Sequence, residues 1–89
     1  MFEIILERSA AKSLSKLPKD AQLRIQGVIE VLATTPRPPA AKKLIGTERL
    51  LWRVRTGNYR IVYEINDGKL IVLVVAIGNR KDIYDRHRL

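Results

Sequence analysis

Apolar and polar positions alternate on both sides of the Gly-Asn pair at 57–58, over the stretch LWRVRTGNYRIVY at 51–63. Gly followed by Asn is typical of a two-residue hairpin loop, because such loops need positive φ at their centre. Pairing across this loop places Arg55 opposite Arg60, and residues that lie opposite each other share a face. The pattern therefore predicts Arg53, Arg55 and Arg60 on one face. The other face should carry Trp52, Val54, Ile61 and Tyr63.

The N-terminal third has the spacing of one strand and two helices. Loose alternation over Phe2 to Glu7 predicts a strand. A 3.6-residue apolar period predicts a helix from Ser9 to Leu17, with Ser9 as its N-cap, and a longer helix from Lys19 to Ala33. Gly27 interrupts the longer helix at a cost of about 1 kcal/mol relative to alanine. We interpret this glycine as a point where another element approaches the helix closely.

Prolines end the helical pattern, and strands follow. The segment 34–41, which reads TTPRPPAA, is a connector within one domain. Strands are predicted over Glu48 to Arg55, Tyr59 to Asn66 and Lys69 to Ile77, and Asp67-Gly68 is expected to be a second two-residue turn.

The last of these strands is apolar at nearly every position, which indicates an interior strand with both faces buried. The expected register places Val75 opposite Arg60, as an apolar floor under the arginine face. We predict one α+β domain over residues 1–89, in which an N-terminal strand and a two-helix hairpin precede a three-stranded antiparallel sheet. A short basic C-terminal tail ends the chain.

The composition of the chain limits the kinds of catalytic or binding site that it can form. The chain of 89 residues has no cysteine, and its one histidine, His87, is the third residue from the end. The sequence shows no disulfide framework, no cluster of metal ligands and no phosphate-cradling glycine loop. Its longest apolar run, residues 70–77, is too short to span a bilayer. We therefore expect a cytoplasmic protein that needs no metal or cofactor and does not insert into a membrane.

The net charge of +8 is unevenly placed along the sequence. Residues 1–36 hold five basic and four acidic residues, a net of +1, whereas residues 37–60 hold seven basic residues and one acidic residue, a net of +6. A local basic field attracts phosphate backbones or an acidic protein. The simplest alternative is that these arginines are ordinary solvated charges on an exposed face.

One reaction suits a chain whose polar chemistry is arginine, lysine and tyrosine. RNA can be cleaved by its own 2′-hydroxyl, so that the substrate supplies the nucleophile. The protein then orients that hydroxyl, stabilises charge on the phosphate and moves two protons. Arginine supplies charge and bidentate contacts. A tyrosine or lysine near arginines can accept a proton if its pKa is lowered.

Three motifs carry a resemblance to a known family: KKLIG at 42–46, WRVRTGNYRIVYEI at 52–65 and VVAIGNRKDIY at 74–84. With the spacing of the helices, they make the chain similar to the RelE/ParE superfamily of toxins, and closest to its RelE-like branch. The resemblance covers nearly the whole chain. It implies a toxin of a type II toxin–antitoxin system that cleaves messenger RNA in the ribosomal A site without a metal. It also implies an acidic, RelB-like antitoxin as partner, in a toxin–antitoxin hetero-oligomer.

The resemblance also implies roles for particular residues. Arg60 matches the arginine that stabilises the scissile phosphate, Arg80 matches the one that aids the leaving 5′-oxygen, and Tyr84 matches a tyrosine that stacks on a base or moves a proton. RNA contacts are expected from Lys43, Arg53 and Arg55. The last two stand where RelE proteins often have lysines. Because arginine is a poor proton acceptor, Tyr84 gains weight as the general base, with His87 as a weaker candidate.

Two other classes of function stay open at this point. One is a ParE-like toxin that inhibits DNA gyrase and cuts nothing. The other is a non-catalytic module that binds RNA or the ribosome.

Overall fold

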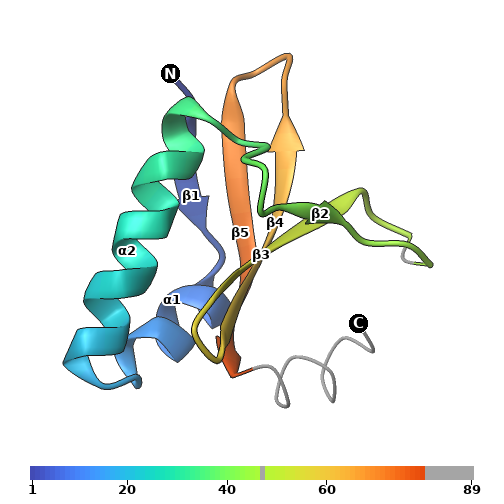
Figure 1. Cartoon of the computed structure of the whole chain (residues 1–89). Helices are drawn as coiled ribbons and strands as arrows, with labels where there is room; N and C mark the ends of the chain where they lie inside the picture. Colours follow the sequence, from blue (N-terminus) through green and yellow to red (C-terminus); the bar gives the residue numbers. More distant parts are fainter. Residues whose placement is uncertain (47, 80–89) are drawn as a thin grey trace.

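The computed structural model describes residues 1–46 and 48–79, in which two helices cover one face of a five-stranded sheet (Figure 1). In chain order the elements are β1 (Glu3–Leu6), α1 (Arg8–Ser15), α2 (Lys19–Thr34), β2 (Lys42–Lys43), β3 (Leu51–Thr56), β4 (Tyr59–Asn66) and β5 (Ile71–Asn79). The strand order is β1-β5-β4-β3-β2. β1 runs parallel to β5, and every other neighbouring pair is antiparallel.

The predicted α+β class is confirmed, but the sheet is wider than expected. β1 joins one edge beside β5, and the two residues of β2 pair with β3 at the other edge. β5 lies between β1 and β4, so the prediction of an interior apolar strand is confirmed. Among the described residues, no helix is long and apolar enough to cross a membrane.

The first helix begins earlier than the sequence suggested. The residue before it is Glu7, whose N–H donates a backbone hydrogen bond to the Val74 carbonyl at 2.9 Å, so the chain turns from the sheet directly into α1. Ser9 therefore lies inside the first turn, and its prediction as the N-cap was wrong. The second helix extends one residue beyond the predicted Lys19 to Ala33, and Pro18 precedes it.

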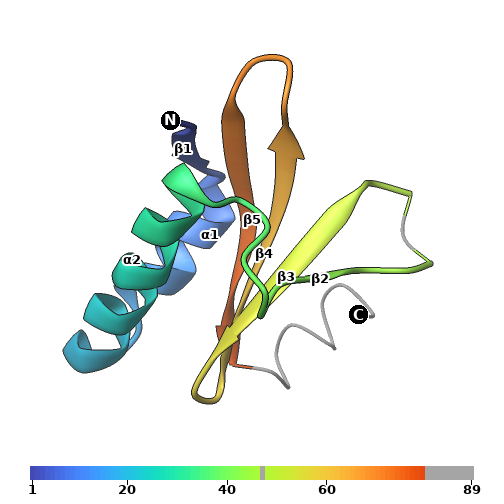
Figure 2. The same ribbon diagram turned by 45° about the horizontal axis from the view of Figure 1, so that its top comes forward.

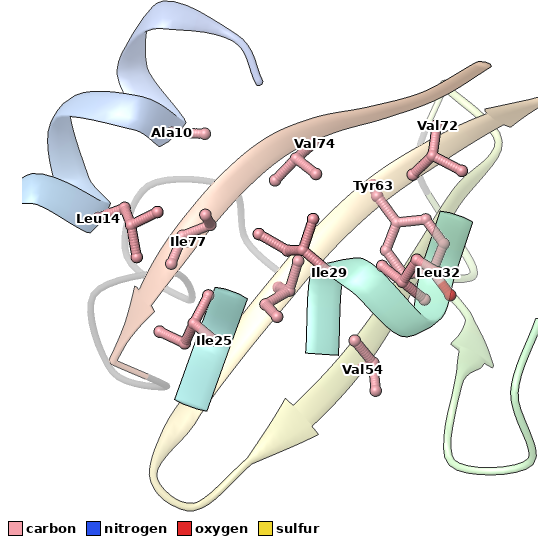
Figure 3. Packing of buried hydrophobic residues seen from close by; sticks show 11 residues of the cluster. Ala10, Leu14, Ile25, Ile29, Leu32, Val54, Tyr63, Val72, Val74 and Ile77 are labelled. Carbon is pink, nitrogen blue, oxygen red and sulfur yellow. The ribbon is translucent and has the colours of Figure 1, made fainter. Parts of the chain in front are cut away.

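The core lies between the helices and the sheet (Figure 3). The inward side of α2 contributes residues at helical spacing, and every second residue of β3 and β4 faces them, as strand geometry requires. The fully buried side chains of this layer include Ile25, Leu32, Ile61, Tyr63 and Val74. Because Val54, Ile61 and Tyr63 belong to this cluster, the predicted apolar face of the hairpin is confirmed.

The connection between β4 and β5 differs from the predicted two-residue turn. Asn66 pairs with Ile71, so four residues separate the strands. The Asn66 side chain accepts a hydrogen bond from the Lys69 N–H at 2.9 Å, and Leu70 adopts a φ of 54°. Asparagine side chains that bond the backbone in this way favour turns, which explains the longer loop.

A β-bulge shifts the register further. The pairing with β5 changes between Val62 and Tyr63, so that Val62 lies opposite Ala76 and Arg60 lies opposite Gly78. The prediction that Val75 lies opposite Arg60 was therefore wrong. Loop length and bulge together move the partner of Arg60 three residues along β5, from an apolar side chain to a glycine.

Candidate functional site

The β3–β4 hairpin has the predicted register and carries the candidate site. Thr56 pairs with Tyr59 and Arg55 with Arg60 across a two-residue loop. Gly57 has a φ of 60°, which glycine adopts without strain, and a Cβ at this position would lie 2.8 Å from the Arg24 side chain of α2. The backbone conformation therefore favours glycine at this turn, whereas the flexible, exposed Arg24 side chain could move aside.

Four basic residues share the sheet face that the described helices leave open, and we call them the basic cluster: Lys42, Arg53, Arg55 and Arg60. Lys42 lies opposite Arg53, and Arg55 lies opposite Arg60. Cβ atoms of residues paired in this way are about 4.5–5.5 Å apart, and like charges there are destabilising. Two such pairs in succession concentrate positive charge on this face. The predicted common face of the three arginines agrees with this register.

The four members of the basic cluster differ in exposure. Lys42 and Arg55 are exposed and Arg53 is half-buried, whereas the Arg60 side chain is only 2% exposed. The Nε and Nη2 atoms of Arg60 are shielded from solvent. A guanidinium stays charged in such surroundings, and its interaction with an anion is stronger there than in water. Arg60 is thus the member of the basic cluster whose charge is least screened by water.

An apolar patch lies beside the basic cluster on the same open face. Leu51, Val62, Val75 and Ala76 are buried there, with Leu44 and Leu73 packed against them. Val62 is two residues from Arg60 on β4 and lies opposite Arg53 on β3. The apolar surface expected next to Arg60 is therefore found beside it and begins at Val62, the next residue of β4 on the same face.

The one acidic residue of β4, Glu64, is hydrogen-bonded to an arginine outside the basic cluster. Glu64 accepts a hydrogen bond from the Arg49 Nε at 3.0 Å, and Glu7 accepts one from the Arg49 Nη2 at 3.3 Å. The Glu64 hydrogen bond, ahead of the weaker Glu7 contact, raises the pKa of Arg49. These contacts bind Arg49 into an ion cluster with two carboxylates, at the opposite end of β4 from the turn.

On the side that faces the helices, the hairpin is held by contacts with Pro36 and Arg37 of the connector after α2. The buried Tyr63 hydroxyl donates to the Pro36 carbonyl at 2.7 Å, and burial raises the Tyr63 pKa to about 12. Arg37 donates two hydrogen bonds to Asp67, at 3.2 Å and 2.8 Å, and its Cζ lies 5.4 Å from the centroid of the Trp52 ring. The Arg37 hydrogen bond lowers the pKa of Asp67.

The structure places some of the predicted site residues together and others apart. Lys43 lies opposite Trp52, so the register puts it on the face away from Arg53. Sequence reasoning missed Lys42. The adjacent pair 42–43 offered a signal, since neighbours on a strand point to opposite faces, but only the pairing with β3 shows which lysine joins the arginines.

The other predicted site residues are in the tail. Arg80, Tyr84 and His87 lie outside the described residues. Among the residues that are described, no group of three His, Cys, Asp or Glu side chains could hold a metal ion.

Comparison with known proteins identifies the family to which this chain belongs. The family model described as "ParE toxin of type II toxin-antitoxin system, parDE" matches residues 4–84. This chain belongs to that family of type II toxin–antitoxin toxins.

Two relatives by sequence are named as RelE toxins. A RelE-like toxin protein of Escherichia coli is 28% identical over 86 residues, covering 94% of this chain and 90% of that protein. Toxin RelE1 of Methanocaldococcus jannaschii is 28% identical over 86 residues, covering 93% and 94%.

The fold agrees with these names. The toxin fold in the archaeal RelE–RelB complex of Pyrococcus horikoshii OT3 matches with a TM-score of 0.78 and 26% identity, over 89% of this chain and 94% of that one. The predicted membership of the RelE/ParE superfamily is therefore confirmed, and the chain is RelE-like in fold.

Proposed function

We propose that this toxin is an endoribonuclease that cleaves messenger RNA in the ribosomal A site, without a metal, and thereby inhibits translation. The observation that carries the proposal is the basic cluster, whose β4 member, Arg60, is buried. Four cations on one sheet face match the charge of a phosphate backbone, and a desolvated guanidinium matches the charge that develops on one phosphate.

The proposed reaction needs no nucleophile from the protein. The 2′-oxygen attacks the adjacent phosphorus, the bond from phosphorus to the 5′-oxygen breaks, and the products are a 2′,3′-cyclic phosphate and a 5′-hydroxyl. A base removes the proton of the 2′-hydroxyl, and an acid donates a proton to the leaving 5′-oxygen. Negative charge on the non-bridging oxygens rises in the transition state, and stabilising it is the role proposed for Arg60.

The remaining roles rest on the resemblance to RelE proteins. Arg80 is proposed to stabilise the leaving oxygen, and Tyr84 is proposed as the general base. Arg53 and Arg55 are proposed to bind the RNA backbone, with Lys42 added because its register places it opposite Arg53. Lys43 remains a proposed RNA contact, reached from the edge of the sheet, since β2 is an edge strand and both lysines are exposed.

The proposed physiological partner is an acidic, RelB-like antitoxin in the cytoplasm. Membership of a toxin–antitoxin family supports a proteinaceous partner, and the Pyrococcus horikoshii relative was solved as a RelE–RelB complex. Acidic groups brought to the basic cluster would compete with RNA for it and would be steered by its field.

The decisive experiment compares two RNA substrates in a translating system. The full chain is expected to cut a message in the A site and to leave a 2′,3′-cyclic phosphate. A single 2′-deoxy substitution at the cut site removes the nucleophile, so cleavage there should vanish. Strict magnesium dependence on a ribosome-free model RNA, or undiminished cutting of the deoxy substrate, would contradict the proposal.

A double variant tests the residues. Arg60→Ala with Arg80→Ala is expected to lower the cleavage rate by at least about 10²-fold, the usual effect of removing a charge-stabilising donor. Ribosome binding should remain, because Lys42, Arg53 and Arg55 are unchanged. Lys12→Ala on the exposed side of α1 is the matched control and should cut at the parental rate.

A second candidate function follows from the family description, which names ParE. A toxin of the ParE type that inhibits DNA gyrase would use the basic face to bind protein or DNA and would leave messages intact. Gyrase supercoiling assays with the same purified chain separate the two candidates. Loss of supercoiling with no new RNA 5′ ends would favour the gyrase inhibitor.

A further inference from the structure

The side of α2 that faces away from the sheet is exposed and carries apolar residues. Leu23 is 62% exposed and Val31 is 49% exposed. They lie four residues before and four residues after Gly27, so the three positions form one stripe along the helix. We call the exposed residues of α2 its solvent face: Lys19, Asp20, Leu23, Arg24, Gln26, Gly27, Glu30, Val31 and Thr34.

Gly27 has no packing role within the described part of the chain. A Cβ added to Gly27 would meet no atom within 4 Å, so the expected close approach by another element of the same chain is not found there. Glycine weakens a helix interior relative to alanine, and here nothing in the described fold calls for it. A glycine in the centre of an exposed apolar stripe does allow the backbone of a second helix to come close.

The charges of α2 also differ from those of the rest of the chain. Lys19 and Arg24 balance Asp20 and Glu30, so the helix has a net charge of zero in a chain of net charge +8. An acidic or polyanionic partner gains nothing from this surface. A neutral surface is the one on which two copies of a strongly basic chain repel each other least.

The pattern around Gly27 is self-complementary for antiparallel helices. A two-fold axis through Gly27 brings position 27−k of one helix against position 27+k of the other. Leu23 then meets Val31 of the second copy, and Arg24 meets Glu30 of the second copy, each contact occurring twice. A parallel arrangement would instead place Arg24 against Arg24.

We propose that the solvent face of α2 is a self-association surface, on which a second copy of this chain packs its own α2 antiparallel with Gly27 at the crossing. The contact buries Leu23 and Val31 and pairs Arg24 with Glu30. In the single chain the Arg24 side chain lies beside Gly57 of the hairpin turn. Because Arg24 is exposed, its side chain can reorient toward Glu30 of the second copy. The surface is separate from the basic cluster, which lies on the other side of the sheet.

The area buried between the two α2 helices limits how stable the proposed dimer can be. A helix of 16 residues is about 24 Å long. One helix pair of this length buries less than the roughly 1,200–2,000 Å² of stable interfaces, so the dimer is weak and its population rises with protein concentration.

The first experiment uses the absence of cysteine from the sequence. Helix axes about 8–10 Å apart put the two Cα atoms at position 27 about 3.4–5.4 Å apart, which overlaps the roughly 4.4–6.8 Å of disulfides. Under mild oxidation of the purified full chain, the Gly27→Cys variant should therefore form a covalent dimer. Lys12→Cys, at an exposed site on α1, is the matched control, and its cross-linking should be at least about tenfold slower.

The second experiment reverses charges. Arg24→Glu alone, or Glu30→Arg alone, turns two attractions into two repulsions, and each should weaken dimerisation in sedimentation equilibrium by about tenfold. The double variant Arg24→Glu with Glu30→Arg should restore it. An equimolar mixture of the two single variants should associate as a heterodimer, because each supplies the charges that the other lacks.

Three results would overturn the proposal. The first is cross-linking of Gly27→Cys no faster than that of Lys12→Cys. The second is a double charge reversal as weak as the single ones. The third is a Gly27→Cys thiol that is protected from alkylation by added antitoxin but not by raised concentration of the chain itself, which would assign the surface to the antitoxin. Circular dichroism of each variant shows that the helix is intact, and none of these readouts depends on RNA cleavage.

Discussion

The β3–β4 hairpin belongs to a sheet with the helices on one side (Figure 2), so its two faces have different surroundings. On the face toward the helices, Tyr63 donates to Pro36, Trp52 lies under Arg37, and Arg37 is bonded to Asp67. On the open face, Lys42 lies opposite Arg53 and Arg55 lies opposite Arg60. The first face pairs polar groups with complementary partners. On the second face the register sets cation opposite cation near the turn, while Glu64, further along β4, accepts a hydrogen bond from Arg49. The first face thus carries contacts that hold the fold together, and the second carries the basic cluster on which the proposed function rests.

The largest expected effect concerns the face toward the helices. Tyr63→Ala removes a fully buried aromatic ring and should lower the free energy of unfolding by about 3–5 kcal/mol. Tyr63→Phe keeps the ring but leaves the Pro36 carbonyl without its donor, and should cost about 1–3 kcal/mol. Urea denaturation measures both values. If this face serves the fold, RNA affinity per folded molecule stays unchanged in Tyr63→Phe. A loss of affinity as large as that of an open-face variant would remove the distinction between the two faces.

A smaller effect is expected on the open face, in binding rather than stability. Arg55→Gln should reduce the slope of log affinity against log salt by about 0.7 for single-stranded RNA, the value for one lost phosphate contact. Affinity for a 2′-deoxy-protected oligonucleotide, measured by fluorescence anisotropy between low and moderate salt, gives the slope. Lys12→Gln removes an exposed charge from the helix layer and is the control. Equal slopes for the two variants would mean that RNA responds only to total charge and not to the basic cluster.

The smallest effect concerns the exposed contact between Arg37 and Asp67. Asp67→Asn should lower the melting temperature slightly, and less than Tyr63→Phe does, because exposed ion pairs contribute little. The sign of the pH dependence follows from the lowered pKa of Asp67. The stabilisation is fully present above the unfolded-state pKa of about 3.9 and is lost as the pH falls through the folded-state value. Melting curves of parent and variant should therefore converge in acid, and a gap that widens there would contradict this account.

Much of the site could be predicted because its geometry is local. The Gly57-Asn58 loop sets the pairing of Arg55 with Arg60, and strand alternation then sets the face of Arg53. These relations span only a few residues, and positive φ at the turn admits few alternatives to glycine. The helix from Lys19 onward was predictable for a similar reason, since its apolar period runs over four turns.

Non-local pairing accounts for what could not be predicted. The side-chain contact of Asn66 with Lys69 and the bulge at Val62–Tyr63 decide that Gly78, and not Val75, lies opposite Arg60. The pairing of β2 with β3 decides that Lys42, and not Lys43, shares the face of Arg53. Register across loops depends on the whole set of contacts between strands, and a shift by one residue exchanges the two faces.

The sequence by itself determined the α+β class, the hairpin with its three arginines on one face, and the resemblance to RelE toxins. These follow from short-range periodicity, turn chemistry and motifs. Only the tertiary structure decided that Arg60 is buried while Arg55, its cross-strand partner, is exposed. Both residues are arginines in the same alternating pattern, so nothing in their local sequence separates them. The burial of a side chain is set by what packs around its strand, and β4 lies in the middle of the sheet whereas β3 lies near its edge.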